Sequence, residues 1–150
     1  MDIGSGNGFP AGSLSNFAPH HFVIDGIECA SMEGFLQSLK FSNPDMQAEV
    51  CKLVGRAAKA KGANKNWRQK QTLYWKGKAY KRDSDEYQKL LDKAYNQLAK
   101  NEGFKKALLA TGNATLTHSV GKKKISDTVL TSKEFTARLT KLREKLRNNA

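Results

Sequence analysis

Residues 31–40 form the clearest local signal in the chain, a helix that presents two different faces. Ser31 is a favoured N-cap residue. The apolar side chains that follow it recur at helical spacing, and they are Met32, Phe35, Leu36 and Leu39. Glu33, Gln37 and Lys40 follow a neighbouring line on the same helix, at offsets of four and three residues. They either form part of a polar site on a rigid element or belong to an ordinary amphipathic helix with a solvated face.

Glu33 also falls in the first turn of this helix. The free backbone N–H groups of a first turn carry partial positive charge, which favours the ionised form of a carboxyl group there. We therefore expect this one helix to offer an anion, an amide and a cation in a row.

Signals on both sides of this helix predict an α+β fold, a mainly helical single domain with a few short strands. The Asp25-Gly26 pair suits a type I′ turn and predicts a hairpin over residues 22–29. A helix is expected over residues 43–61, with a weak point at Gly55. The remaining expected elements are helices over residues 64–82, 86–101 and 104–110, a strand over 114–120, and a C-terminal helix that a capping box opens at 131–134, with Phe135, Leu139 and Leu142 inward.

Length, hydropathy and cysteine usage restrict the class of protein. The chain has 150 residues, and we expect a flexible glycine-rich N-terminus over residues 1–13 and one folded domain over residues 14–150. No apolar run has the length of a membrane span, and no secretion signal is recognisable. Cys29 and Cys51 fit neither a disulfide framework nor a zinc pattern. We therefore expect a cytoplasmic protein with no membrane partner, no metal and no cofactor.

The charge of the chain is large and unevenly distributed. The net charge is +12. Residues 1–50 hold one basic and six acidic side chains, a balance of −5, and the other 100 residues hold 25 basic and 8 acidic ones, a balance of +17. Such a distribution suits an anionic partner such as nucleic acid, a nucleotide or a phosphate ester. The alternative is a lysine-rich surface that only keeps the protein soluble.

Seven short motifs follow one another between residue 14 and about residue 130. They are Leu14-Ser-Asn-Phe17, the hairpin at Asp25-Gly26, Ser31-x-Glu33 with Gln37 and Lys40-Phe41, Gly55-Arg56, Asn66-Trp67, Leu108-Leu-Ala-Thr-Gly112 and Asp127. This order resembles the NADAR family, also called YbiA-like. The resemblance implies an α+β fold and an N-glycosidase that cleaves a ribosyl–nitrogen bond. It also implies that Glu33, Trp67 and Asp127 are the essential residues. His118 stands where many relatives have a Glu, and the segment after Asp127 lacks the family's Trp-Gly pair.

Cleavage of a ribose C1–N bond passes through an oxocarbenium-like state, which requires a carboxylate near the sugar and a proton for the leaving nitrogen. Glu33 is the candidate carboxylate. Asp127 is the candidate second carboxyl group, or else a turn residue. Lys40 binds a phosphate or ribose oxygen in the preferred interpretation. Alternatively it attacks C1 and forms an imine, or it is a solvent lysine beside Glu33.

Five further side chains are candidates for substrate binding. Arg56 has the fork shape that suits a pyrophosphate, and the lysines after it either follow a nucleic-acid backbone or form a solvated face. Trp67 either stacks on a base or packs in the core. Asn16 and Phe17 are expected at the sugar or base end. His118 is a candidate proton donor or an ordinary strand histidine.

The preferred function is removal of ADP-ribose from guanine in nucleic acid, which would counteract DNA ADP-ribosylation in an antitoxin or counter-defence role. One alternative is an N-glycosidase that acts on phosphorylated ribosylamino intermediates of riboflavin synthesis. Another is a non-catalytic module that binds nucleic acid or an ADP-ribose-like ligand. The basic segment favours nucleic acid over a free metabolite.

Overall fold

Six helices and two short hairpins make up residues 1–149, the part of the chain that the computed structural model describes. The helices are α1 (Met32–Ser38), α2 (Pro44–Cys51), α3 (Gly55–Ala63), α4 (Asp85–Leu98), α5 (Glu102–Ala110) and α6 (Ser132–Asn148). The strands are β1 (Phe22–Ile24), β2 (Ile27–Cys29), β3 (Thr72–Trp75) and β4 (Lys78–Lys81), and two short 3-10 turns are η1 (Gly12–Leu14) and η2 (Ile125–Asp127). This arrangement confirms the expected α+β class.

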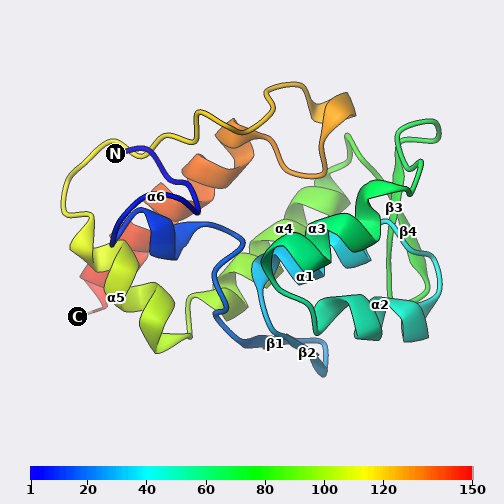
Figure 1. The fold of residues 1–150 in the computed structure, drawn as a ribbon, viewed down its shortest axis with the longest axis horizontal. Coiled ribbons are helices and arrows are strands. Elements are labelled where there is room, and N and C mark those ends of the chain that lie inside the picture. Colours follow the sequence, from blue (N-terminus) through cyan, green and yellow to red (C-terminus); the bar gives the residue numbers. More distant parts are fainter. Residues whose placement is uncertain (150) are drawn as a thin grey trace.

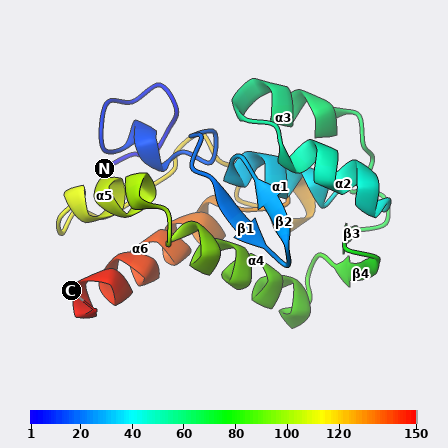
Figure 2. The same ribbon diagram turned by 90° about the horizontal axis from the view of Figure 1, so that it is seen from below.

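The helices form two groups that share one core. Helices α1, α2 and α3 pack together on one side, and α4, α5 and α6 lie on the other (Figure 1). The β1–β2 hairpin lies between the groups and packs on α4, as the view from below shows (Figure 2). Both groups contribute large buried side chains, among them Phe35, Tyr87, Tyr95, Phe104 and Phe135. Burial of these aromatic surfaces supplies much of the drive for folding.

The first hairpin and the helix after it form as predicted. Asp25 and Gly26 both have positive φ, 50° and 78°, as a type I′ turn requires. The strands pair antiparallel, with Phe22 opposite Cys29. The Ser31 side chain accepts a hydrogen bond from the Gly34 backbone N–H at 3.0 Å, so this residue caps α1.

The helix expected over residues 43–61 is two helices, α2 and α3. Asn43 caps α2 through its side-chain oxygen, which accepts hydrogen bonds from two backbone N–H groups. Gly55 has a φ of 53°, in the left-handed region, and this conformation separates the two helices. The expected weak point of the helix, Gly55, therefore marks the boundary between α2 and α3, where one continuous helix was expected.

The helix expected over residues 64–82 is wrong. This region contains the β3–β4 hairpin, in which Thr72 pairs with Lys81 and Trp75 with Lys78. Lys76 and Gly77 both have positive φ at the turn. The side chains of β3 alternate between half-buried and buried positions. The two-residue turn and the alternation of buried side chains at every second residue therefore favour a hairpin over a helix in this region.

The strand expected over residues 114–120 is also absent from the described structure. The segment is irregular, and its one ladder contact is an isolated parallel bridge between Asp2 and Thr117. Ile3 is fully buried beside it, and its backbone N–H donates to the Thr117 oxygen at 2.8 Å. The start of the glycine-rich N-terminus is therefore packed against this segment, in contrast to the flexible lead-in that was expected.

The second half of the chain folds largely as expected. Ser84 caps α4 by accepting a hydrogen bond from the Tyr87 N–H. Thr131 and Glu134 form the predicted capping box of α6. The inward residues of α6 are indeed buried, and they are Phe135, Leu139 and Leu142. Within residues 1–149, no helix combines the length and apolar character that a bilayer crossing requires.

Candidate active site

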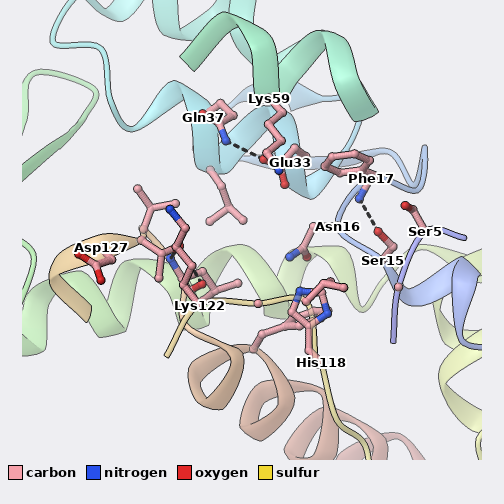
Figure 3. A pocket seen from close by; sticks show the side chains of 18 of the residues that line it. Ser5, Ser15, Asn16, Phe17, Glu33, Gln37, Lys59, His118, Lys122 and Asp127 are labelled. Carbon is pink, nitrogen blue, oxygen red and sulfur yellow. Dashed lines mark hydrogen bonds between the residues drawn. The ribbon is translucent and has the colours of Figure 1, made fainter. Parts of the chain in front are cut away.

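A cavity of about 400 Å³ opens between the two groups of helices. Its volume lies in the range of small-molecule sites, roughly 300–1,000 Å³. The sequence-predicted residues that line it are Asn16, Phe17, Glu33, Gln37, Lys40, Trp67, His118 and Asp127 (Figure 3). Arg56 of α3 is not among the residues that line it. The structure thus brings eight of the nine candidate side chains to one cavity.

Helix α1 forms one wall of the cavity. The Gln37 Nε2 donates a hydrogen bond to Glu33 Oε2 at 2.7 Å. The Gln37 Oε1 has no hydrogen-bond partner among the described residues and lies against Gly62 of α3. A Cβ at residue 62 would lie 1.9 Å from this oxygen, so only glycine allows α3 to approach α1 this closely.

The loop before the first hairpin holds Asn16 beside this wall. The Glu33 backbone N–H donates to the Asn16 carbonyl oxygen at 2.9 Å, which ties the loop to the first turn of α1. The buried Tyr95 hydroxyl donates to Asn16 Oδ1 at 2.6 Å. Because this bond occupies Oδ1, the Asn16 NH₂ group is left to donate to a ligand. Tyr95 was missed as a site residue, because its place on α4 predicts core packing and nothing more.

Burial shifts the pKa values of Glu33 and Lys40 in opposite directions. Desolvation raises the pKa of Glu33, although the Gln37 hydrogen bond and the Lys40 charge act in the opposite direction. Desolvation likewise lowers the pKa of Lys40, although the Glu33 charge opposes this shift. The expectation that the helix N-terminus would favour ionised Glu33 is therefore wrong in sign. Both groups carry their neutral forms more readily than they would in water.

His118 stands at the end of the cavity nearest the N-terminus. Its Nδ1 lies 2.7 Å from the Ile3 carbonyl oxygen, which can only accept, so Nδ1 carries a proton. The imidazole packs edge-on against Phe135, with ring centroids 5.0 Å apart. Asp2 supports the same segment, because its carboxylate accepts a hydrogen bond from the Ser119 N–H at 2.8 Å. His118 is thus held by the first residues of the chain and not by the strand that was expected.

Asp127 ends the η2 turn, is exposed, and lies across the cavity from Glu33 (Figure 3). The segment after it is anchored by Arg82, which follows β4, and by Tyr87 of α4. The Arg82 Nε donates to the Thr128 oxygen at 2.8 Å, and the Tyr87 hydroxyl donates to the Val129 oxygen at 2.6 Å.

Arg82 is fully buried and forms a two-pronged ion pair with Glu134, at 2.6 and 3.1 Å. Desolvation opposes ionisation of Glu134, but hydrogen bonds from Arg82 and from the Thr131 backbone outweigh it and lower the pKa of Glu134. This ion pair fixes Arg82, which in turn holds the cavity-lining segment 127–130.

Trp67 serves both the core and the cavity. It is 8% exposed, packs in the hydrophobic core, and presents one side to the cavity. Lys59 of α3 and Lys122 of the predicted basic loop also line the cavity. For Lys59, the sequence suggested only a contact with a nucleic-acid backbone, and it suggested no role for Lys122. Within residues 1–149, no three His, Cys, Asp or Glu side chains gather closely enough to hold a metal ion.

Comparisons with known proteins identify the family and the fold of this chain. A family model described as Bacteriophage protein GP30.3 matches residues 8–144. The uncharacterized 17.1 kDa protein in the Gp30-rIII intergenic region of Enterobacteria phage T4 is 38% identical over 149 residues, which is 97% of this chain and 98% of that protein. The NMR structure of the E. coli protein YbiA superposes with a TM-score of 0.64 at 18% identity, over 99% of this chain and 85% of YbiA. That likeness shows a YbiA-like fold. The family model spans most of the sequence, and this chain therefore belongs to the family of Bacteriophage protein GP30.3.

Proposed function

We propose that the protein is an N-glycosidase that hydrolyses a ribosyl–nitrogen bond and removes ADP-ribose from guanine in nucleic acid. The observation that carries this proposal is the pairing of Glu33 and Lys40 on one cavity wall, each with its neutral form favoured by burial. Perturbed acid and base groups in a cavity are typical of catalytic sites. The resemblance to NADAR proteins supplies the reaction class, and the YbiA-like fold supports it.

The proposed chemistry uses the two groups in sequence. Glu33 in its protonated form donates the proton that the leaving guanine nitrogen needs as the C1–N bond breaks. The bond electrons leave with the guanine, and the resulting Glu33 carboxylate stabilises the positive charge on the sugar. Neutral Lys40 attacks C1 of the sugar and forms a C1–N bond, and the Glu33 carboxylate takes a proton from the attacking amine. Glu33 passes this proton to the ring oxygen as the C1–O bond breaks, which opens the ribose and leaves an imine on Lys40. Water then adds to C1 and the C1–N bond breaks, which releases ADP-ribose and restores the amine.

The other cavity residues have supporting roles in this proposal. The Asn16 amide, held by Tyr95, donates to the ribose hydroxyl groups. Trp67 contributes an apolar wall, and His118 lies at the end where a base can enter. Asp127, across the cavity from Glu33, positions the water that hydrolyses the imine.

Release of free ADP-ribose from ADP-ribosylated DNA tests the proposal directly. Glu33→Gln keeps the shape and the hydrogen bond to Gln37 but removes the acid. We expect it to slow release by about 100-fold or more, the usual scale for a lost general acid. Glu28→Gln is the matched control, because Glu28 is exposed on β2. Full release by a folded Glu33→Gln variant would exclude Glu33 as the acid and refute the mechanism.

Two additional arms of the assay separate the alternatives. Retention of ADP-ribosylated DNA without release of ADP-ribose would identify a binding module. Cleavage of an amino-ribosyl pyrimidine phosphate, with no release from DNA, would assign the enzyme to riboflavin intermediates instead.

A further inference from the structure

We propose that Lys59 and Lys122 form an anion subsite that binds the diphosphate of the substrate's ADP-ribose group. This inference rests on the proposed function, since it names the part of the same cavity that binds the phosphates. It also replaces Arg56, which the sequence suggested for this task and which lies outside the cavity.

The cations converge from separate elements of the fold. Lys59 belongs to α3, and Lys122 belongs to the loop that precedes η2. Both line the cavity. Figure 3 shows Lys59 beside Glu33 on one side and Lys122 on the loop across the cavity. Lys59, Lys122 and Arg68 each act on Lys40 as nearby positive charges.

These cations lack the acidic partners that other lysines of the chain have. Four other lysines form ion pairs with carboxylates, and they are Lys52, Lys78, Lys93 and Lys105. Within residues 1–149, no Asp or Glu oxygen lies within 4.0 Å of the charged nitrogens of Lys59, Lys122 or Arg68.

Two carboxyl groups line the same cavity as these cations. They are Glu33, whose neutral form burial favours, and the exposed Asp127. The cavity therefore has an excess of positive charge, which a bound anion with two phosphate groups would relieve.

The shape of the site favours a diphosphate over a nucleic-acid backbone. The lysines face each other across a hollow of about 400 Å³ and can contact a compact anion from two sides. A backbone would instead follow a stripe of cations over an open surface.

Calorimetric titration with inorganic pyrophosphate tests the subsite without any catalytic step. We expect wild-type protein to bind pyrophosphate and ADP-ribose but not adenosine. The Lys59→Gln/Lys122→Gln double variant should bind both ligands at least about tenfold more weakly, because two charged contacts are lost. The matched control is Lys61→Gln/Lys123→Gln, which removes the same charge from neighbouring positions of α3 and of the same loop, neither of which lines the cavity. It should bind like the wild type.

The outcomes separate this inference from the proposed function. If wild-type protein does not bind pyrophosphate, or if the double variant binds it as tightly as the control, the subsite is refuted. If an unmodified single-stranded oligonucleotide displaces pyrophosphate as well as ADP-ribose does, the lysines belong to a backbone site and the inference also fails. If pyrophosphate binding is lost in the double variant but the wild type releases no ADP-ribose from DNA, the subsite stands and the proposed activity fails.

Discussion

The side chains of the cavity show how burial competes with local electrostatics. A first-turn position favours an ionised carboxyl group, typically by 0.3–1 kcal/mol. Desolvation acts against the ion and is the larger effect at Glu33, since the pKa of this residue is raised. The position of Glu33 on its helix could be read from the sequence, but its charge state could not. That state depends on how much chain from other segments covers the side chain.

Lys40 provides the prediction at the residue scale. Because burial lowers its pKa, a larger share of Lys40 is a free amine at neutral pH than for a surface lysine. Addition of borohydride during turnover of ADP-ribosylated DNA should therefore reduce the imine and leave a covalent sugar adduct on Lys40. Intact-protein and peptide mass spectrometry would detect it.

Two variants control this trapping experiment. Lys40→Arg should give no adduct, and Lys61→Arg should be trapped like the wild type. Turnover in the presence of borohydride without any adduct would limit Lys40 to binding the ribose or phosphate oxygens.

At the scale of elements, caps and turns were predictable where the signal is local. Ser31, Asn43 and Thr131 each cap the helix that was expected after them. The β3–β4 hairpin was missed because the Lys76-Gly77 turn is a weaker signal than Asp-Gly, and the alternation of the buried residues Leu73 and Trp75 spans only a four-residue strand. Over so few residues, the sequence pattern alone does not distinguish the periodicity of a strand from that of a helix.

Arg56 and Lys59 show the same limit in the candidate site. They lie three positions apart on α3, and both are basic. Only Lys59 lines the cavity, because the positive φ of Gly55 sets the direction and rotation of the helix. Side-chain type and spacing suggested a basic contribution from this region, but the choice between the two residues depends on how α3 packs on α1.

The packing of α1 on α2 leads to a prediction for Gly34. A Cβ there would lie 2.6 Å from the Leu53 carbonyl oxygen and 3.0 Å from that of Cys51. A change from glycine to alanine inside a helix ordinarily stabilises by about 1 kcal/mol. At this position the clash with backbone should reverse the sign, so Gly34→Ala should lower the free energy of unfolding by about 2 kcal/mol.

Urea unfolding measures this effect. Gly6→Ala serves as the control, because no atom lies within 4 Å of a Cβ at that position. Equal stability of Gly34→Ala and the wild type would mean that α1 can move away from α2 at no cost.

At the scale of the whole molecule, two buried carboxyl groups give the stability a characteristic dependence on pH. The pKa of Glu134 is lowered in the folded state, so its contribution is present above the ordinary value of 4.5 and is lost as pH falls through the folded pKa. The pKa of Glu33 is raised, so the folded state loses stability as pH rises from 4.5 through the folded pKa. The two residues therefore act at opposite sides of the ordinary glutamate pKa.

Two substitutions should separate these contributions. Glu33→Gln should raise the free energy of unfolding at pH 8, by about 1 kcal/mol, and should have little effect at pH 4. Glu134→Gln should cost about 3–5 kcal/mol at pH 7, because it leaves Arg82 buried without its partner, and should flatten the loss of stability at acid pH. Urea unfolding between pH 3 and pH 8 measures both, with exposed Glu28→Gln as the control. A Glu33→Gln variant less stable than the wild type at pH 8 would contradict the expected sign.

The walls of the cavity come from segments spread over almost the whole chain, from Gly4 to Phe135. During translation, the pocket cannot close until α6 has begun to leave the ribosome, so a nascent chain has no working site for most of its synthesis. A proteolytic cut between these segments would leave no single fragment with all the walls of the cavity.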